Sequence, residues 1–209
     1  MRLLLVGATG LVGGHVLAQA LADARVAAIV APTRRALAAH DKLHNPVVDF
    51  EQLPADADWW RADALVCTLG TTIKAAGSQA AFRRVDHDYP LAVARLAHRR
   101  GTPTCVLNSA TGANAGSRIF YNRVKGEVEQ ALAEVGFASL TLVRPGLIGG
   151  QRQESRPAER VGQIVLGALG PVLPRGWRIN PAPRIAQAML AAALSAPPGR
   201  HVVGASALV

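Results

Sequence analysis

Three side chains in the middle of the sequence, Ser109, Tyr121 and Lys125, have the types and the spacing needed for acid–base chemistry at a hydroxyl or carbonyl group. Tyr121 and Lys125 are four residues apart in a segment expected to be helical, so they share one helix face. An adjacent ammonium group favours the ionised form of a tyrosine hydroxyl and makes it a better acid or base near neutral pH. Ser109 would donate a hydrogen bond to the substrate oxygen and stabilise the charge that develops there. A Tyr-x-x-x-Lys pair alone is common by chance. It becomes evidence for a catalytic site because Ser109 precedes it and a glycine loop lies far upstream.

The glycine loop lies between a short apolar run and an amphipathic run at the start of the chain. Its residues are Gly7, Ala8, Thr9, Gly10, Leu11, Val12 and Gly13. Gly7 permits a tight turn, Gly10 lets backbone N–H groups approach a pyrophosphate, and Gly13 lets the helix lie close to the strand. The N-terminus of that helix presents partial positive charge to the phosphates. We therefore predict that this loop binds a dinucleotide rather than forming only a structural turn.

The end of the second expected strand indicates which dinucleotide is preferred. An NAD site usually has an acidic residue there to accept from the ribose 2′-hydroxyl. Here the sequence after Val30 contains Arg34 and Arg35 and no carboxylate. Guanidinium groups match a 2′-phosphate by forked, charge-assisted hydrogen bonds, so NADP(H) is predicted over NAD(H). The alternative is that the two arginines lie at the surface and open a helix.

The rest of the sequence supplies the elements that would position these groups. Short runs rich in Val, Leu and Ile predict strands at 2–6, 26–30, 46–50, 64–68, 103–108 and 139–143. Longer periodic runs predict helices at 11–24, 78–100, 118–135, 157–168 and 182–195. Pro90 should bend or break the second helix, and Gly101 and Gly136 should end the second and third. The alternation predicts an α/β protein with a three-layer Rossmann fold, a doubly wound parallel sheet with helices on both faces. We expect one domain over 1–209, with 146–184 as a lid or substrate segment.

Composition narrows the class of protein. The apolar stretches 161–174 and 185–196 fall short of the ~20 residues that a membrane-spanning helix needs, so no membrane partner is expected. Cys67 and Cys105 form no CxxC pair and no ligand set is visible, which predicts reduced thiols in a cytoplasmic protein without a metal site. The net charge of +9 comes from scattered arginines without interleaved aromatic residues, which favours a solvated surface over specific nucleic-acid binding.

The glycine loop, Ser109 and the Tyr-x-x-x-Lys pair together resemble the short-chain dehydrogenase/reductase superfamily. More narrowly, the chain is similar to its atypical members, the Tat-interacting-protein-like oxidoreductase group and its bacterial relatives. The segments that carry this resemblance are Gly7–Gly13, Cys67–Thr72, Val85–Tyr89, Tyr121–Glu127, Val143–Leu147 and Gln153–Pro157. The likeness therefore extends from the start of the chain to about residue 160. A bacterial source is a separate expectation, which comes from this resemblance.

The resemblance implies further contacts with the cofactor. Leu69, Gly70 and Thr71 would lie against the dinucleotide, Asp49 and Phe50 near the adenine, and Pro145, Gly146 and Leu147 beside the nicotinamide. Tyr121 and Lys125 would also contact the cofactor. Asp86 stands where many superfamily members have an asparagine that anchors a water in the proton path, which leaves its part in a proton relay open.

The predicted function is that of an NADP(H)-dependent oxidoreductase that transfers a hydride to or from a small carbonyl or alcohol. A regulatory protein that senses NADP(H) with little or no catalysis is the rival hypothesis. An epimerase or dehydratase is less favoured, because the chain lacks the larger C-terminal substrate portion that such enzymes carry. The sequence leaves open the substrate and whether the protein is a monomer or a homodimer.

Overall fold

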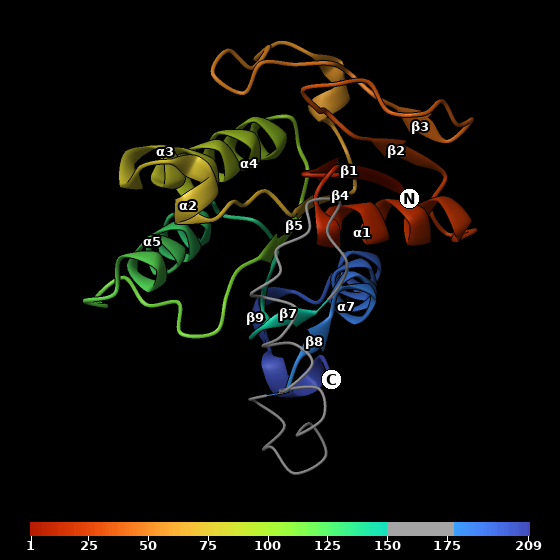
Figure 1. Ribbon diagram of the computed structural model, residues 1–209. Helices are drawn as coiled ribbons and strands as arrows, with labels where there is room; N and C mark the ends of the chain where they lie inside the picture. The colour runs from red at the N-terminus through yellow and green to blue at the C-terminus, as the bar shows by residue number, and fades with distance from the viewer. Residues whose placement is uncertain (150–177) are drawn as a thin grey trace.

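The computed structural model describes residues 1–149 and 178–209, and these residues are organised around a parallel sheet of seven strands. The strand order is β3-β2-β1-β4-β5-β6-β9, so the chain builds outward from β1 in both directions (Figure 1). The strands are β1 (Arg2–Val6), β2 (Ala28–Val30), β3 (Leu43–His44), β4 (Ala64–Cys67), β5 (Thr104–Asn108), β6 (Ser139–Arg144) and β9 (Gly199–Gly204). A separate pair joins β7 (Ile148–Gly149) to β8 (Asn180–Pro181).

Helices cover both faces of this sheet. They are α1 (Leu11–Ala22), α2 (Ile73–Ala76), α3 (Gln79–Arg83), a π-helical turn (Arg84–Asp88), α4 (Tyr89–Arg99), α5 (Phe120–Val135) and α7 (Ala182–Ser195). Two short 3-10 turns lie at Asp58–Trp60 and Ala205–Ala207. Within 1–149 and 178–209, no helix has the length and the apolar character to cross a bilayer.

Alternate residues of the central strands fill two separate cores. In β1, Leu3 and Leu5 pack with α1 and α7, whereas Leu4 and Val6 pack toward α4 and α5. Figure 1 shows these two helix pairs on opposite sides of the sheet. Because successive side chains of a strand point to opposite faces, a strand buried on both faces reads as an uninterrupted apolar run. The predicted three-layer, doubly wound Rossmann fold is therefore confirmed.

The edges of the sheet differ from the prediction. The strand expected at 46–50 is wrong: β3 has only two residues, Leu43 and His44, and beyond it Val47 makes one isolated bridge to Thr33. Val47 is 60% exposed, so its apolar type does not report a buried strand. The opposite edge strand, β9, was not predicted because four of its six residues are exposed and its first part is polar. The helix expected at 157–168 lies outside the described residues.

Pro90 does not break the long helix expected at 78–100. Arg84, Asp88 and Tyr89 keep right-handed helical dihedral angles, and the backbone continues from α3 through the π-helical turn Arg84–Asp88 into α4. The disturbance expected from Pro90 is limited to this irregular turn. Gly101 and Gly136 follow α4 and α5 with φ values of 86° and 92°, so both stops are confirmed in the left-handed region that glycine tolerates. The π turn is important for the site because it carries Asp86 inward.

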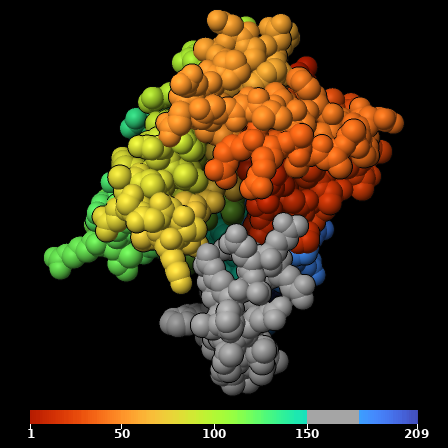
Figure 2. Space-filling view, turned by 45° about the horizontal axis from the view of Figure 1, so that its top comes forward, coloured from red at the N-terminus to blue at the C-terminus, as the bar shows by residue number. Residues whose placement is uncertain are grey.

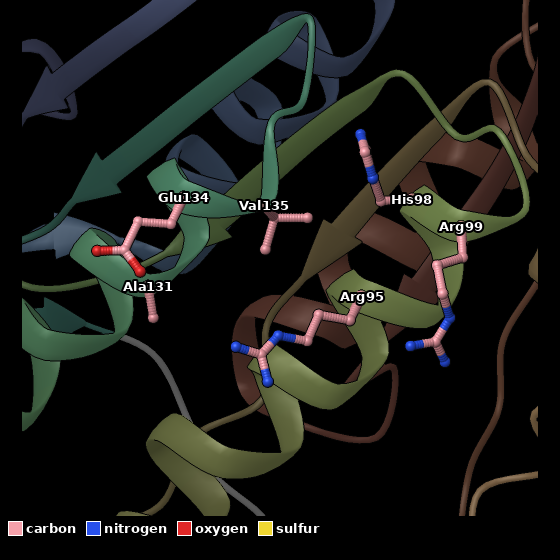
Figure 3. Close-up of a pocket in the computed structure, with 6 residues that line it drawn as sticks. All are labelled: Arg95, His98, Arg99, Ala131, Glu134 and Val135. Carbon is pink, nitrogen blue, oxygen red and sulfur yellow. The ribbon is translucent and has the colours of Figure 1, made fainter.

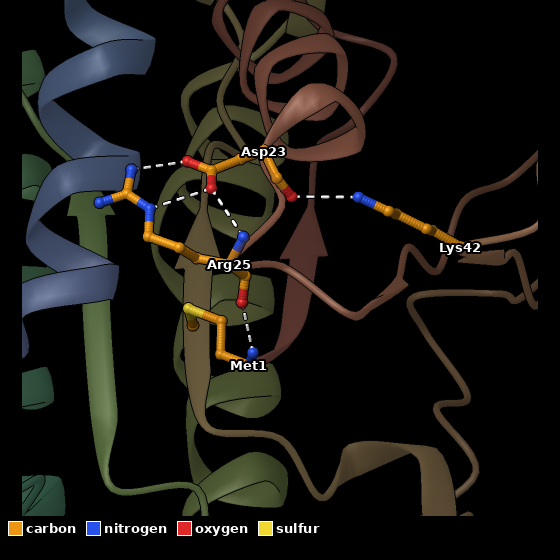
Figure 4. Close-up of polar contacts among 4 residues, drawn as sticks. All are labelled: Met1, Asp23, Arg25 and Lys42. Atoms are coloured by element: carbon orange, nitrogen blue, oxygen red, sulfur yellow. Dashed lines mark hydrogen bonds and ion pairs between the residues drawn. The ribbon is translucent and has the colours of Figure 1, made fainter.

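Polar contacts fix the connection between α1 and β2 at the far end of the helix from the glycine loop (Figure 4). The Asp23 carboxylate accepts hydrogen bonds from the Arg25 backbone N–H at 2.9 Å and from its guanidinium, and Met1 donates to the Arg25 carbonyl. Lys42 Nζ donates to the carbonyls of Asp23 and Leu21, each at 3.0 Å. The side-chain hydrogen bond from Arg25 lowers the pKa of Asp23 to about 2. These contacts hold the βαβ unit that presents the N-terminus of α1 to the site.

Candidate functional site

The candidate site lies at the edge of the sheet that is formed by the carboxyl ends of the parallel strands. Gly7 follows β1, Thr68 follows β4, Ser109 follows β5 and Pro145 follows β6. The direction of strand order reverses between β1 and β4, and ligands of open α/β sheets bind at such a switch point. Figure 2 shows a recess between the segment after β2, in orange, and α2 with α3, in yellow, with atoms of the first residues, in red, visible inside it.

The glycine loop makes the tight turn predicted at Gly7 and the close approach of helix to strand predicted at Gly13. Gly7 has a φ of 87°. The turn from Gly7 to Gly10 is closed by a hydrogen bond of 2.9 Å from the Gly10 N–H to the Gly7 carbonyl. A Cβ at Gly13 would stand 2.0 Å from the Gly7 carbonyl oxygen and 2.5 Å from Thr68 Oγ1. Any side chain at Gly13 would therefore push α1 away from β1 and β4.

The N-terminus of α1 is suited to an anion. Its first turn has neither an acidic residue nor a side-chain cap, and Gly10 is the N-cap. Among the residues that the structure describes, the N–H groups of Leu11, Val12 and Gly13 have no acceptor. Helix N-termini leave these donors unpaired and carry partial positive charge, which a phosphate can satisfy. The residues present thus fit the diphosphate of a dinucleotide.

Arg34 and Arg35 lie just beyond β2 and extend into solvent. In the described residues, neither guanidinium has a hydrogen-bond or ion-pair partner, whereas the backbone beneath them is fixed. The buried Thr33 donates through Oγ1 to the Arg35 carbonyl at 2.7 Å, and Asn45 Nδ2 donates to Thr33 Oγ1 at 2.7 Å. A rigid backbone with two free cations is an arrangement that can accept a phosphate.

The residues expected near the adenine separate into one exposed and one buried side chain. Asp49 is exposed and its carboxylate accepts from Glu51 N–H at 2.9 Å, whereas Phe50 is buried against the Tyr89 ring with a centroid distance of 5.6 Å. Tyr89 donates its hydroxyl proton to Glu51 Oε1 at 2.5 Å. Burial, together with this carboxylate, raises the pKa of Tyr89 to about 12. The loop after β3 is thereby attached to the start of α4.

The loop after β4 connects the expected cofactor contacts to the expected acid–base group. Leu69 and Thr71 are partly buried and Gly70 is exposed. Thr71 N–H donates to Asp86 Oδ2 at 2.8 Å. A Cβ at Gly70 would lie 3.3 Å from Asp86 Oδ1 and 3.8 Å from Lys125 Nζ, so the absence of a side chain brings this backbone close to both charges.

Lys125 forms a buried ion pair with Asp86, with a distance of 2.8 Å between Nζ and Oδ1. The two side chains are only 6% and 1% exposed. Burial alone would lower the pKa of Lys125, but attraction to Asp86, to a smaller extent to Tyr121, and the hydrogen bond to Asp86 outweigh it, so the pKa is raised. Tyr121 lies one helical turn before Lys125, half-buried, with its ring 5.6 Å from that of Phe82. Lys125 is therefore a charged group whose field at Tyr121 is opposed by a neighbouring carboxylate.

Ser109 is placed differently from the expectation. It is buried, and its hydroxyl donates to Glu129 Oε1 at 2.6 Å. Glu129 comes eight residues after Tyr121 on α5, about 12 Å along the helix axis. Arg144 pairs with both oxygens of Glu129, and this hydrogen bonding raises the pKa of Arg144. A hydroxyl has one proton, so in this arrangement the Ser109 proton is directed to Glu129, on α5 two turns beyond Tyr121, rather than to a substrate oxygen.

The turn expected beside the nicotinamide is held by a buried amide. Asn180 is fully buried; its Oδ1 accepts from Gly146 N–H at 2.7 Å and its Nδ2 donates to the Ala205 carbonyl at 2.9 Å. Asn180 N–H also donates to the Leu147 carbonyl at 2.8 Å. One side chain thus joins Pro145–Leu147 to the last turn of the chain. Leu147 is 48% exposed and Pro145 is buried.

A pocket of about 340 Å³ lies elsewhere, between the C-terminal halves of α4 and α5 (Figure 3). Its lining residues are Arg95, His98, Arg99, Ala131, Glu134 and Val135. Ala131 comes ten residues after Tyr121, about 15 Å further along α5. The pocket is therefore separate from the candidate site.

Sequence reasoning missed Thr68 and Glu129 and left Asp86 without a role. Glu129 follows Lys125 by four residues, and residues at this spacing lie on the same face of a helix. A buried Lys125 therefore predicts that Glu129 is buried as well. Thr68 had a weaker signal: it is one of several polar residues directly after a buried strand. Its Oγ1 donates to the Val6 carbonyl at 2.9 Å and fills the space that Gly7 and Gly13 leave.

The chain is similar to curated proteins along most of its length, although no family model matches it. It is 36% identical to "Protein fmp52, mitochondrial" of Aspergillus fumigatus, across 98% of this chain and 95% of that protein. It is also 36% identical to "Protein HTATIP2" of Rattus norvegicus, across 89% of this chain and 78% of that protein. The solved structure of MoeE5 in complex with UDP-glucose and NAD matches this chain with a TM-score of 0.73 at 16% sequence identity. The match includes 98% of this chain and 76% of the MoeE5 chain. This last likeness shows the fold.

These relatives correct two expectations. The fungal relatives are named mitochondrial, which contradicts the prediction of a cytoplasmic protein. That prediction rested on Cys67 and Cys105, which are free and buried. Burial raises the pKa of Cys67 to about 12, and a buried neutral thiol reports its local surroundings rather than a compartment. The relatives named here are fungal and mammalian, so they do not support a bacterial source.

Proposed function

This chain belongs to the family of the fmp52 and HTATIP2 proteins, an atypical branch of the short-chain dehydrogenase/reductases, and on that premise we propose that it is an NADP(H)-dependent oxidoreductase of a small carbonyl or alcohol. Gly7–Gly13 and the first turn of α1 would hold the diphosphate, and Arg34 and Arg35 the 2′-phosphate. The dinucleotide, when bound, would supply or accept the hydride. Tyr121 would give a proton to the substrate oxygen or take one from it.

The observation that carries the proposal is the buried contact from Lys125 through Asp86 to the backbone of Thr71. It joins the helix that carries Tyr121 to a loop at the same sheet edge as the glycine loop. An acid–base group is effective only when it is held in place against the reacting atom. Two buried side chains with complementary charges and a hydrogen bond of 2.8 Å to the loop provide that rigidity.

Cofactor preference is tested by calorimetric titration of NADP⁺ and NAD⁺ into the purified chain and into the double variant Arg34→Gln, Arg35→Gln. Loss of charge-assisted hydrogen bonds worth about 1.5–3 kcal/mol should weaken NADP⁺ binding by about 10- to 150-fold and leave NAD⁺ binding unchanged. Arg99→Gln is the matched control, because Arg99 is also exposed but lies at the separate pocket. Equal affinity of the unaltered chain for both dinucleotides would refute the preference.

Catalysis is tested by NADPH consumption with a panel of aldehydes, ketones and quinones. Tyr121→Phe keeps the ring that packs on Phe82 and removes only the proton donor. It should lower kcat by about 10²–10⁴-fold while the Kd for NADPH stays the same. Turnover that survives this substitution would show that Tyr121 has no acid–base role.

A regulatory protein that senses NADP(H) is the second candidate, and the Asp86–Lys125 pair supports it as well. Because Asp86 compensates the charge of Lys125, the ammonium favours an ionised Tyr121 less than a free cation would. The same pair links the loop Leu69–Thr71 to α5, so occupancy of the loop could be passed to that helix. Tight NADP(H) binding, no turnover across the panel and an altered α5 in hydrogen exchange on binding would favour this candidate.

A further inference from the structure

We infer that Thr111, rather than Ser109, supplies the hydroxyl that hydrogen-bonds the substrate oxygen in the proposed reaction. The inference rests on the proposed function and assigns one more residue to its site. Two hydroxyl side chains follow β5 within three residues, and only their surroundings distinguish them.

Ser109 already has a buried hydrogen-bond partner. Its hydroxyl donates to Glu129 Oε1 at 2.6 Å, and the same carboxylate pairs with Arg144 and lies 3.8 Å from Arg200. Glu129 is 2% exposed, so the loss of a donor would leave a buried carboxylate oxygen without its full set of partners. The free-energy cost of such a loss opposes rotation of Ser109 toward a substrate.

Thr111 is hydrogen-bonded to the start of the turn that is expected beside the nicotinamide. Its N–H donates to the Pro145 carbonyl at 2.8 Å, and its Oγ1 donates to the Arg144 carbonyl at 3.0 Å. Thr111 is exposed, and its acceptor is a neutral carbonyl rather than a buried carboxylate. A threonine hydroxyl rotates freely, so its proton can leave this carbonyl for a substrate oxygen without stranding a charge.

The turn that contains Thr111 packs on the part of α5 that carries Tyr121. Gly112, with a φ of 82°, would place a Cβ 3.1 Å from Asn122 Nδ2. Asn114 N–H donates to the Asn122 carbonyl at 3.0 Å, and Asn122 is the next residue after Tyr121. Ser109, in contrast, bonds to α5 two turns further on. Thr111 is therefore the hydroxyl that the backbone holds on the Tyr121 side.

The test compares Thr111→Val, Thr111→Ser, Ser109→Ala and Tyr121→Phe in the complete chain. 9,10-Phenanthrenequinone serves as the carbonyl probe, with kcat/KM measured for its reduction by NADPH and its Kd measured calorimetrically on the NADP⁺ complex. Valine keeps the shape of threonine and lacks the hydroxyl. Thr111→Val should lower kcat/KM by about 10²–10³-fold, as removal of one donor to a developing oxyanion does. It should weaken quinone binding by about 2- to 10-fold, the effect of one hydrogen bond.

The controls separate this inference from the proposed function. Thr111→Ser should restore most of the kcat/KM, and Thr111→Val should keep the melting temperature and the Kd for NADP⁺. Ser109→Ala should lower the melting temperature and lose less kcat/KM than Thr111→Val. A larger loss with Ser109→Ala, or full activity in Thr111→Val while Tyr121→Phe is inactive, overturns the assignment of Thr111 alone. If the unaltered chain neither reduces nor binds the quinone, the catalytic proposal fails and this inference fails with it.

Discussion

Replacement of Asp86 by asparagine separates the charge of this residue from its hydrogen bond to the loop Leu69–Thr71. An asparagine keeps an oxygen for Thr71 N–H but leaves Lys125, whose side chain is 6% exposed, without an anion. At the observed 2.8 Å, the attraction between the two charges is about 6 kcal/mol at an effective dielectric constant of about 20. Desolvation of both groups offsets part of this, and loss of one partner of a buried pair costs about 3–5 kcal/mol.

We therefore expect Asp86→Asn to lower the free energy of unfolding at pH 7 by about 3–5 kcal/mol. For a chain of this length, the melting temperature should fall by about 6–20 °C. Urea denaturation followed by circular dichroism measures the first quantity and calorimetry the second. Asp88→Asn is the matched control: it lies on the same π-helical turn with a side chain 53% exposed, so its effect should stay below about 1 kcal/mol.

The pH dependence gives a second, independent check. In the unaltered chain the pKa of Lys125 is raised above 10.5, so its contribution to stability is fully present below pH 10.5 and is lost as the pH rises through the raised value. In Asp86→Asn only burial acts strongly on Lys125 and lowers its pKa, so the folded state binds fewer protons than the unfolded state and stability rises with pH. The difference between the two proteins should therefore narrow between pH 7 and pH 10. A stability loss below about 1 kcal/mol, or a difference that does not narrow, would refute the account of a buried ion pair.

Three further outcomes follow from buried or hydrogen-bonded groups. In Tyr121→Phe, near-ultraviolet absorbance should show the remaining Tyr89 ionising at about pH 12, and its contribution to stability should be lost as the pH rises from 10 through 12; ionisation near pH 10 contradicts this. Iodoacetamide should label Cys67 and Cys105 only after denaturation, because burial raises the pKa of both thiols; rapid labelling of the native chain would count against it. Asn180→Ala should lose about 1–3 kcal/mol of stability and weaken dinucleotide binding, whereas an unchanged melting temperature would dismiss the amide as a structural link.

The sheet was predictable from the sequence wherever burial decided the residue types. β1, β4, β5 and β6 are buried on both faces, so their runs are apolar without interruption and their positions were found. β9 and β3 are edge strands, where one side of the backbone and much of the side-chain surface meet solvent. At such positions exposure to solvent influences the residue type as much as the strand conformation does. The alternation or run of apolar residues that identifies a buried strand is therefore missing.

The placement of the candidate site residues was predictable where it follows from spacing along a single element. Gly7–Gly13 and the pair Tyr121 and Lys125 each belong to one turn or one helix, so counting residues is enough. Ser109 required knowledge of what lies across from it, and that partner is Glu129, held in turn by Arg144 from β6. The acceptor of a hydroxyl proton is decided by contacts between elements that are distant in sequence. The spacing of residues along the chain does not predict such contacts.

Two buried carboxylates, each paired with its own cation, explain why this candidate site differs from a simple Tyr–Lys pair. Glu129 is neutralised by Arg144, and Asp86 is neutralised by Lys125 itself. In a low-dielectric surrounding, the field of Lys125 at Tyr121 is therefore largely that of a dipole, which falls off faster with distance than that of a lone charge. A change that protonates or removes Asp86 would strengthen the field at Tyr121 as long as Lys125 stays protonated, while the folded state loses stability. In Asp86→Asn, stability and the proposed acid–base activity of Tyr121 should therefore change in opposite directions as long as Lys125 stays protonated.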